Sequence, residues 1–239
     1  PPNGTIPLYL GLPEPRPGFD ACARQTVLAA VKHQGMPGVA ALQVHPLEQG
    51  HAGALLGLQQ AVAEIEQGRL ELCIVGGVDG YLHADTIDWL DRDLRLARAT
   101  RRGGFPPGEG AALVMLASER ARSNLRMPSL AIVRAVACAR ETRDETAPEG
   151  LQGEALTAVY RDVATHLQWP RERIDHLYCD VNGERARITD LGFAMLRVGE
   201  LFRDATNYVT PVGQVGDLGA ATAPLGCAGW RWRCSAAPC

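Results

Sequence analysis

The stretch Leu70-Glu71-Leu72-Cys73-Ile74-Val75-Gly76-Gly77 is the part of the sequence that decides the fold. Its apolar run is nearly continuous over residues 70–75 and is closed by two glycines. A strand with one solvated face alternates apolar and polar residues, whereas a strand covered on both faces is apolar throughout. The stretch therefore predicts a strand in a sheet that has helices on both faces.

Helices and strands alternate on either side of this stretch. Just before it, residues 52–67 have helical apolar spacing and are stopped by Gly68. Such alternation predicts an α/β fold with a mostly parallel sheet, interrupted by a Gly/Pro-rich loop over residues 103–110. The other predicted elements are strands over residues 6–12, 38–44, 111–116, 130–137, 174–179 and 208–209, and helices over residues 21–34, 151–167 and 189–202.

Composition excludes several classes of protein and partner. With 46% hydrophobic residues and a net charge of -3, the chain of 239 residues is a globular protein, and we expect neither a nucleic-acid nor a membrane partner. No apolar run approaches the roughly 18 residues of a membrane-spanning helix, and the first four residues do not resemble a signal peptide, so we expect a cytoplasmic protein. The cysteines and histidines show no ligand spacing, so we expect no metal and no cofactor.

The helix over residues 52–67 is unusual because its first three turns have hardly any polar face. Such a helix is expected to be surrounded by protein. The residue that opens it is His51. A helix N-terminus carries partial positive charge and lowers the pKa of a thiol placed there, so enzymes use this position for nucleophiles.

Three local motifs resemble the β-ketoacyl synthases of the thiolase superfamily, which join acyl and malonyl units carried on acyl carrier protein. The helix from His51, followed by QGRLE (residues 67–71) and CIVGGV (residues 73–78), resembles the family's nucleophile helix and the strand after it. The most specific match is RGGFPPGEGAA (residues 102–112), which is similar to the family's "RDGFxxGEGAG". The third motif is a pair of late segments, CDVNG (residues 179–183) and GDLGAA (residues 216–221).

The resemblance implies a thiolase-like layered αβαβα fold with mostly parallel mixed sheets, incomplete at both ends. Residues 1–125 are then the remainder of the N-terminal half, with the central helix and the GEGA loop, and residues 126–225 are part of the C-terminal half. Residues 226–239 lack the family's character and are expected to be an aberrant tail.

The residues at the family's catalytic positions differ from those of the family. The resemblance places His51 at the position of the nucleophilic cysteine, and Asn182 and Asp217 at the positions of the two histidines. Imidazole is a poor replacement for a thiolate, and Asp217 brings negative charge to a place where the family needs donors to an oxyanion. These substitutions predict loss of condensation.

Three interpretations of His51 remain open. It is a polar cap at a dead site, or one half of a His51–Asp217 dyad that activates water while Asn182 donates to the oxyanion, or a contact for a carrier-bound acyl chain without chemistry. As a neutral group at a helix N-terminus, it is not expected to form a stable acyl-enzyme.

The remaining positions that the resemblance places near substrate are Phe105, Gly108, Glu109 and Gly183. For Glu109 itself we expect a structural role, bonding backbone N–H groups of its own loop. The charged loop over residues 180–185 predicts a solvated segment, with an Arg185 contact to a phosphopantetheine or a carboxylate as the alternative.

The predicted function is that of a ketosynthase-like protein of fatty-acid or polyketide metabolism without condensing activity. It would bind the phosphopantetheine-linked acyl chain of an acyl carrier protein, or act as a partner subunit in a homodimer or in a heterodimer with a ketosynthase. Chain-length-factor subunits of aromatic polyketide synthases are a precedent within the family. The alternative is an active acyltransferase or thioesterase that uses His51, Asn182 and Asp217.

Overall fold

A computed structural model of the chain describes residues 4–34, 41–100, 103–143, 150 and 152–227. Its main sheet has the strand order β2-β1-β3-β4, in which β1 is parallel to β2 and to β3, and β4 is antiparallel to β3. The α/β class with a mainly parallel mixed sheet is thus confirmed. The four strands are β1 (Thr5–Gly11), β2 (Ala41–Leu47), β3 (Leu72–Gly80) and β4 (Glu109–Ala117).

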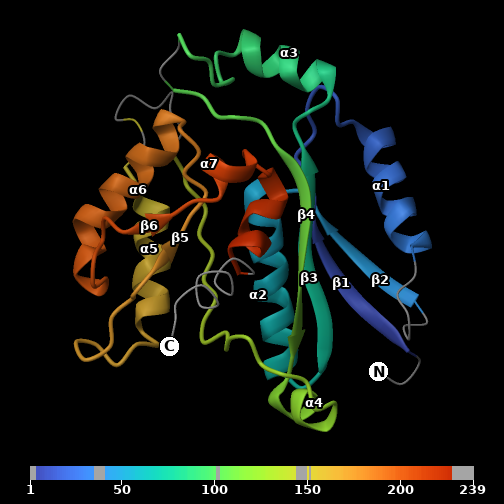
Figure 1. Cartoon of the computed structure of the whole chain (residues 1–239). Coiled ribbons are helices and arrows are strands. Elements are labelled where there is room, and N and C mark those ends of the chain that lie inside the picture. The colour runs from blue at the N-terminus through green and yellow to red at the C-terminus, as the bar shows by residue number, and fades with distance from the viewer. Residues whose placement is uncertain (1–3, 35–40, 101–102, 144–149, 151, 228–239) are drawn as a thin grey trace.

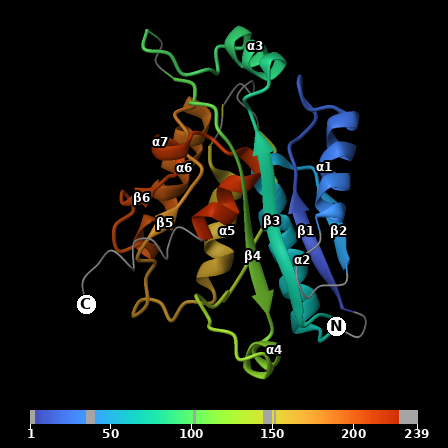
Figure 2. The same cartoon turned by 45° about the vertical axis from the view of Figure 1, so that its right-hand side comes forward.

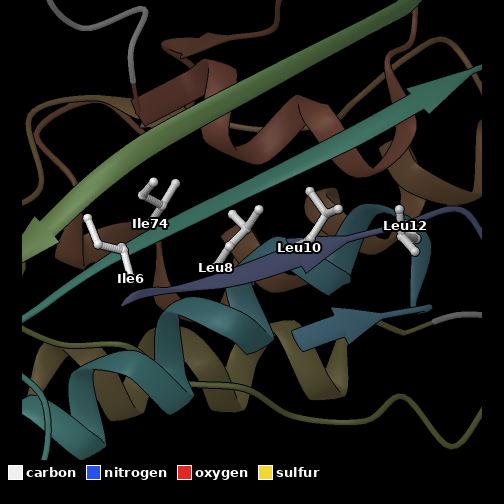
Figure 3. Packing of buried hydrophobic residues seen from close by; sticks show 5 residues of the cluster. All are labelled: Ile6, Leu8, Leu10, Leu12 and Ile74. Atoms are coloured by element: carbon white, nitrogen blue, oxygen red, sulfur yellow. The ribbon is translucent and has the colours of Figure 1, made fainter. Parts of the chain in front are cut away.

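Helices cover both faces of this sheet, as the continuous apolar run predicts. Helix α1 (Ala21–His33) lies on one face and α2 (Gly53–Glu66) on the other (Figures 1 and 2). Successive strand residues point to opposite faces. On the α1 face the core is formed by Ile6, Leu8, Leu10, Leu12 and Ile74 (Figure 3), and on the α2 face by Tyr9, Ala61, Cys73 and Val75.

A second group of elements lies beyond α2, so that α2 is placed between this group and the main sheet (Figure 1). Two short parallel strands form its sheet, and α5 packs against α6. The group contains α5 (Glu154–Ala164), β5 (Leu177–Tyr178), α6 (Arg185–Val198), η2 (Gly199–Leu201), β6 (Tyr208–Val209) and α7 (Val212–Val215). The remaining elements are η1 (Gly50–Ala52), α3 (Ala84–Arg92), α4 (Glu119–Asn124) and η3 (Gly219–Ala221).

Strand β3 continues through Gly76 and Gly77, so the prediction that these glycines close the strand is wrong. The reason is a close approach of two backbones. A Cβ atom on Gly77 would lie 1.9 Å from the carbonyl oxygen of Ala220 in η3. The missing side chain therefore allows η3 to pack directly on β3, and this contact places the preceding residue Asp217 beside the sheet.

The strand predicted over residues 130–137 is absent from the structure. These residues are irregular, Ile132 is 83% exposed, and within the described chain no strand pairs with them. Because a β-strand needs a partner for its backbone hydrogen bonds, an apolar β-prone sequence alone does not form one.

Other expected boundaries also changed. Only Leu177–Tyr178 of the strand predicted over residues 174–179 forms a ladder, and the helix predicted over residues 151–167 is shorter. Helix α6 begins at Arg185 instead of residue 189, because the Asn182 side chain accepts the backbone N–H of Glu184 and turns the chain into the helix. Helices α3, α4 and α7 were not predicted.

Two further expectations concern the exposure of helix α2 and the C-terminal tail. Leu55 is exposed, so the described residues surround α2 less completely than its apolar sequence predicts. The tail expected over residues 226–239 lies outside the described residues from residue 228 onward. Among the residues that are described, none of the helices combines the length and the apolar character needed to cross a membrane.

Candidate functional site

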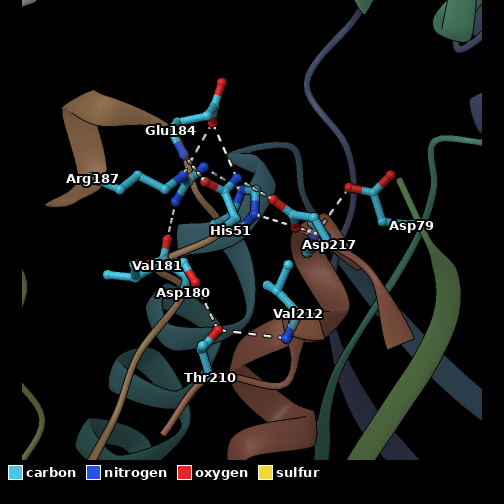
Figure 4. Close-up of polar contacts among 12 residues, drawn as sticks. His51, Asp79, Asp180, Val181, Glu184, Arg187, Thr210, Val212 and Asp217 are labelled. Atoms are coloured by element: carbon cyan, nitrogen blue, oxygen red, sulfur yellow. Dashed lines mark hydrogen bonds and ion pairs between the residues drawn. The ribbon is translucent and has the colours of Figure 1, made fainter. Parts of the chain in front are cut away.

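The three residues that the resemblance predicts for the site lie together, and Figure 4 shows His51 beside Asp217. His51 stands in η1, directly before α2, Asn182 follows β5, and Asp217 precedes η3, which packs against η1. The Nε2 atom of His51 lies 2.7 Å from Oδ1 of Asp217, and Nδ2 of Asn182 donates to Oδ2 of the same carboxylate at 2.6 Å.

Asp217 is the centre of this site. Its side chain is 1% exposed, and besides His51 and Asn182 it accepts the backbone N–H of Gly219 at 2.8 Å. Burial raises the pKa of this carboxyl, but the His51 ring and the hydrogen bonds donated by Asn182 and Gly219 lower it to about 2. Asp217 is therefore an anion that the protein has fully satisfied.

The glycine-rich loop before β4 holds the backbone of Asp217. The N–H of Gly108 donates to the Asp217 carbonyl at 3.0 Å, and the N–H of Asp217 donates to the Pro106 carbonyl at 2.8 Å. Phe105 anchors this loop in the core, where its ring meets the edge of Tyr81 at 5.2 Å between centroids. The most specific sequence motif thus supports Asp217 through its backbone.

The other positions predicted near substrate lie at the margin of the site. Glu109 is exposed, and its role in the loop stays a prediction. Gly183 has a φ of +109°, and a Cβ atom there would lie 2.6 Å from the Gly104 carbonyl oxygen. This glycine lets the Asn182 loop pass close to the loop that carries Phe105.

Arg187 of α6 is a site residue that the sequence analysis missed. Its Nη2 atom lies 3.2 Å from Nδ1 of His51, Nη1 pairs with Asp180, and Nε lies 3.4 Å from Oε2 of Glu184 (Figure 4). Burial lowers the pKa of Arg187, but Asp180, Asp217 and Glu184 together raise it above its ordinary value. Arg187 is therefore a permanent cation beside the imidazole.

The contact with Arg187 fixes the state of His51. A guanidinium group donates hydrogen bonds and accepts none, so Nδ1 of His51 must be the acceptor and carries no proton. The proton then resides on Nε2, which donates to Asp217. We assign this tautomer from the hydrogen-bond partners, and in it both ring nitrogens of His51 are engaged.

Asn182 is engaged just as completely. One amide hydrogen goes to Asp217 and the other to Oε2 of Glu184 at 3.1 Å, while Oδ1 accepts the N–H of Glu184 at 3.0 Å. Glu184 also accepts from Arg95 Nε at 2.6 Å. Burial raises the pKa of Glu184, but the hydrogen bonds from Arg95 and Asn182 lower it below its ordinary value. The loop over residues 180–185 is thus held by a network of side-chain hydrogen bonds, which corrects the expectation of a solvated segment.

A second buried ion pair lies next to this network. Arg16, from the proline-rich loop after β1, donates to Asp79 at the end of β3 at 2.5 Å, with side chains 8% and 1% exposed. The other oxygen of Asp79 accepts the N–H of Ala220 at 3.0 Å. Asp79 therefore ties β3 to η3, the element that follows Asp217.

The described residues were also compared with the arrangement that a metal site needs. Among the described residues, no group of three or more His, Cys, Asp and Glu side chains is arranged to hold a metal ion.

Comparison with known proteins gives one family match, over part of the chain. Residues 48–121 match the sequence profile of the Beta-ketoacyl synthase, N-terminal domain. No curated protein sequence matches the chain.

Several solved ketosynthase structures share the fold. The ketosynthase from module 6 of the bacillaene synthase from Bacillus subtilis 168 superposes with a TM-score of 0.67 at 16% identity, covering 93% of this chain and 42% of that one. An oxazolomycin ketosynthase domain from Streptomyces albus JA3453 gives a TM-score of 0.66 at 17% identity over 95% of this chain and 43% of that one. The chain thus spans about two fifths of the length of the ketosynthases it matches. The profile match confirms the resemblance to the β-ketoacyl synthases over residues 48–121, and the solved structures show that the chain has a ketosynthase, thiolase-like fold.

Proposed function

We propose that this ketosynthase-like protein lacks condensing activity and serves fatty-acid or polyketide metabolism as an acyl-binding or partner subunit. Its ligand would be the phosphopantetheine-linked acyl chain of an acyl carrier protein. The same proposal includes pairing in a homodimer or in a heterodimer with a ketosynthase. It also includes a cytoplasmic location and the division of the chain into parts of two thiolase halves.

The state of His51 is the observation that carries this proposal. In the family a thiolate at this position takes the acyl group as a thioester. Here Nε2 of His51 is bound to Asp217 and Nδ1 is bound to Arg187, so neither ring nitrogen offers a free lone pair. A group without a free lone pair cannot act as a nucleophile.

The two other catalytic positions support the same conclusion. Condensation needs donors aimed at an oxyanion and at the malonyl carboxylate. Both amide hydrogens of Asn182 are committed to carboxylates, and Asp217 accepts hydrogen bonds and carries negative charge. A negative charge at this place would oppose the anionic intermediates of condensation.

One observation favours the alternative of an active acyltransferase or thioesterase. The 2.7 Å contact between Asp217 and His51 is the orienting half of a catalytic triad, in which a carboxylate holds one imidazole nitrogen so that the other can accept a proton. In this structure that other nitrogen faces Arg187, so the dyad lacks the free base that hydrolysis requires.

A condensation assay tests the proposed function. The protein is incubated with an acyl-carrier protein and a malonyl-carrier protein, and products are read by mass spectrometry, with an active ketosynthase as the positive control. We expect no 3-oxoacyl product. Formation of that product by the wild-type protein, and its loss in His51→Ala, would contradict the proposal.

The binding half of the proposal needs its own measurement. Titration calorimetry with an acyl-carrier protein is compared with the same carrier that bears phosphopantetheine without an acyl chain. We expect tighter binding of the acylated form, because burial of each methylene contributes about 0.8 kcal/mol. Equal affinity for the two forms would show that the acyl chain is not recognised.

A further inference from the structure

We propose that Arg187 is a positioning residue that masks the basic nitrogen of His51, and that the Asp217–His51 pair becomes reactive toward acylating reagents once Arg187 is removed. The first support is the geometry of the contact. Nη2 of Arg187 lies 3.2 Å from Nδ1 of His51, on the side of the ring opposite to the nitrogen that binds Asp217.

Arg187 is held in this position by its own partners. Asp180 pairs with Nη1 and Glu184 with Nε, so two of the three guanidinium nitrogens are held by groups other than His51. Glu184 is fixed in turn by Arg95 and by Asn182. Because none of these contacts involves His51, they position the cation against the imidazole independently of it.

Removal of Arg187 would leave an arrangement that catalytic sites use. Asp217 would still orient the ring through Nε2–H, and the Nδ1 lone pair would become free. Diethyl pyrocarbonate reports such a lone pair. Nδ1 attacks a carbonyl carbon of the reagent, the N–C bond forms, and the C–O bond to the leaving ethyl carbonate breaks. The Nε2 proton is lost to solvent through Asp217, and ethyl carbonate decomposes to carbon dioxide and ethanol.

The experiment compares the wild type with three variants. Arg187→Leu removes the donor, Arg187→Lys keeps a positive charge and a donor, and Arg185→Leu is the matched control. Arg185 is an exposed arginine on the same helix, and the described hydrogen bonds of His51 go to Asp217 and Arg187 instead. The rate of His51 carbethoxylation is measured by peptide mapping and divided by the rate of the exposed His166 in the same molecules.

We expect Arg187→Leu to raise this ratio by roughly tenfold, the factor that a charge-assisted hydrogen bond is worth. Arg187→Lys should give a smaller increase, and Arg185→Leu none. An unchanged ratio in Arg187→Leu, or a wild-type His51 that reacts as fast as His166, would overturn the proposal.

Two readouts separate masking from a merely structural role. The buried thiol of Cys73 should remain unreactive toward iodoacetamide in every variant, whereas general loosening would expose it. Nitrogen-15 NMR of the wild-type protein should show His51 protonated at Nε2 alone, and a proton on Nδ1 would overturn the proposal without any variant.

This role of Arg187 rests on the proposed function, so the experiments must distinguish failure of the masking role from failure of the proposed function. A 3-oxoacyl product in the condensation assay contradicts the proposed function. An unmasked wild-type His51 contradicts the role of Arg187 and leaves the condensation result unchanged.

Discussion

Nε2 of His51 and Oδ1 of Asp217 lie 2.7 Å apart, although 166 residues separate them along the chain. His51 lies directly before helix α2, which packs on the main sheet. Asp217 reaches the site because η3 packs on Gly77 of β3. A buried carboxylate is costly unless its oxygens are satisfied. The contact therefore joins the two parts of the fold by a hydrogen bond that neither partner can lose without cost.

Replacement of Asp217 by asparagine should destabilise the protein. The new amide would place a donor against the Nδ2 donor of Asn182, which now binds Oδ2 at 2.6 Å. We expect the free energy of unfolding in urea to fall by about 2–4 kcal/mol. The control is Asp175→Asn, because Asp175 forms an exposed pair with Arg203, which is worth at most about 1 kcal/mol. Equal losses in the two variants would contradict a special role for Asp217.

Acid should weaken the same network. The folded state lowers the pKa of Asp217 from 3.8 to about 2, so its contribution is complete above the unfolded pKa and is lost as the pH falls through the folded one. The shift corresponds to about 2 kcal/mol, lost between about pH 4 and about pH 2. Urea midpoints measured across this range should fall more steeply for the wild type than for Asp217→Asn. Parallel curves would show that Asp217 does not carry the effect.

Loss of Arg16 should be more damaging than loss of an exposed arginine. Arg16→Leu leaves Asp79 buried at 1% exposure, and within the described part of the chain its remaining donors are the backbone N–H groups of Gly80 and Ala220. We expect unfolding to become easier by about 3–5 kcal/mol. In Arg203→Leu the change should stay below about 1 kcal/mol. A loss below about 1 kcal/mol in Arg16→Leu as well would show that the Arg16–Asp79 pair is dispensable.

A methyl group at Gly77 should separate η3 from the sheet. Its carbon would lie 1.9 Å from the Ala220 carbonyl oxygen, a distance that the structure can accept only by moving η3 away. We expect Gly77→Ala to lower the free energy of unfolding by about 3 kcal/mol or more, measured by thermal and urea denaturation. Gly213→Ala is the matched control, because a methyl group there meets nothing within 4 Å. Similar stability of both variants would argue against the close approach.

The sequence predicted the architecture wherever each element carried its own signal. The run over residues 70–75 is almost entirely apolar because helices cover both faces of β3. The helical periodicity of residues 52–67 matches α2. Residues 130–137 were mispredicted because a strand depends on a partner that the local sequence does not reveal. The local sequence predicts that Gly76 and Gly77 end the strand, whereas the strand continues through them. The reason for glycine at position 77 is the backbone of residue 220, which lies far away in the sequence.

The structure brings the predicted site residues together and adds neighbours that the sequence did not indicate. The family resemblance placed His51, Asn182 and Asp217 at corresponding positions, and the structure brings them together. Arg187 was missed because its only sequence signal is the i, i+3 pair with Glu184, which is common on exposed helices. The partner of Asp79 could not be predicted, because Arg16 lies 63 residues away in a loop without periodicity.

Intact-protein mass spectrometry after incubation with an acyl-carrier protein tests the central claim most directly, namely that both nitrogens of His51 are engaged and that His51 does not become acylated. The account predicts that the mass of the wild-type protein stays unchanged, while an active ketosynthase treated in parallel gains one acyl group. An acyl adduct on the wild-type protein, mapped to His51 and absent from His51→Ala, would contradict it.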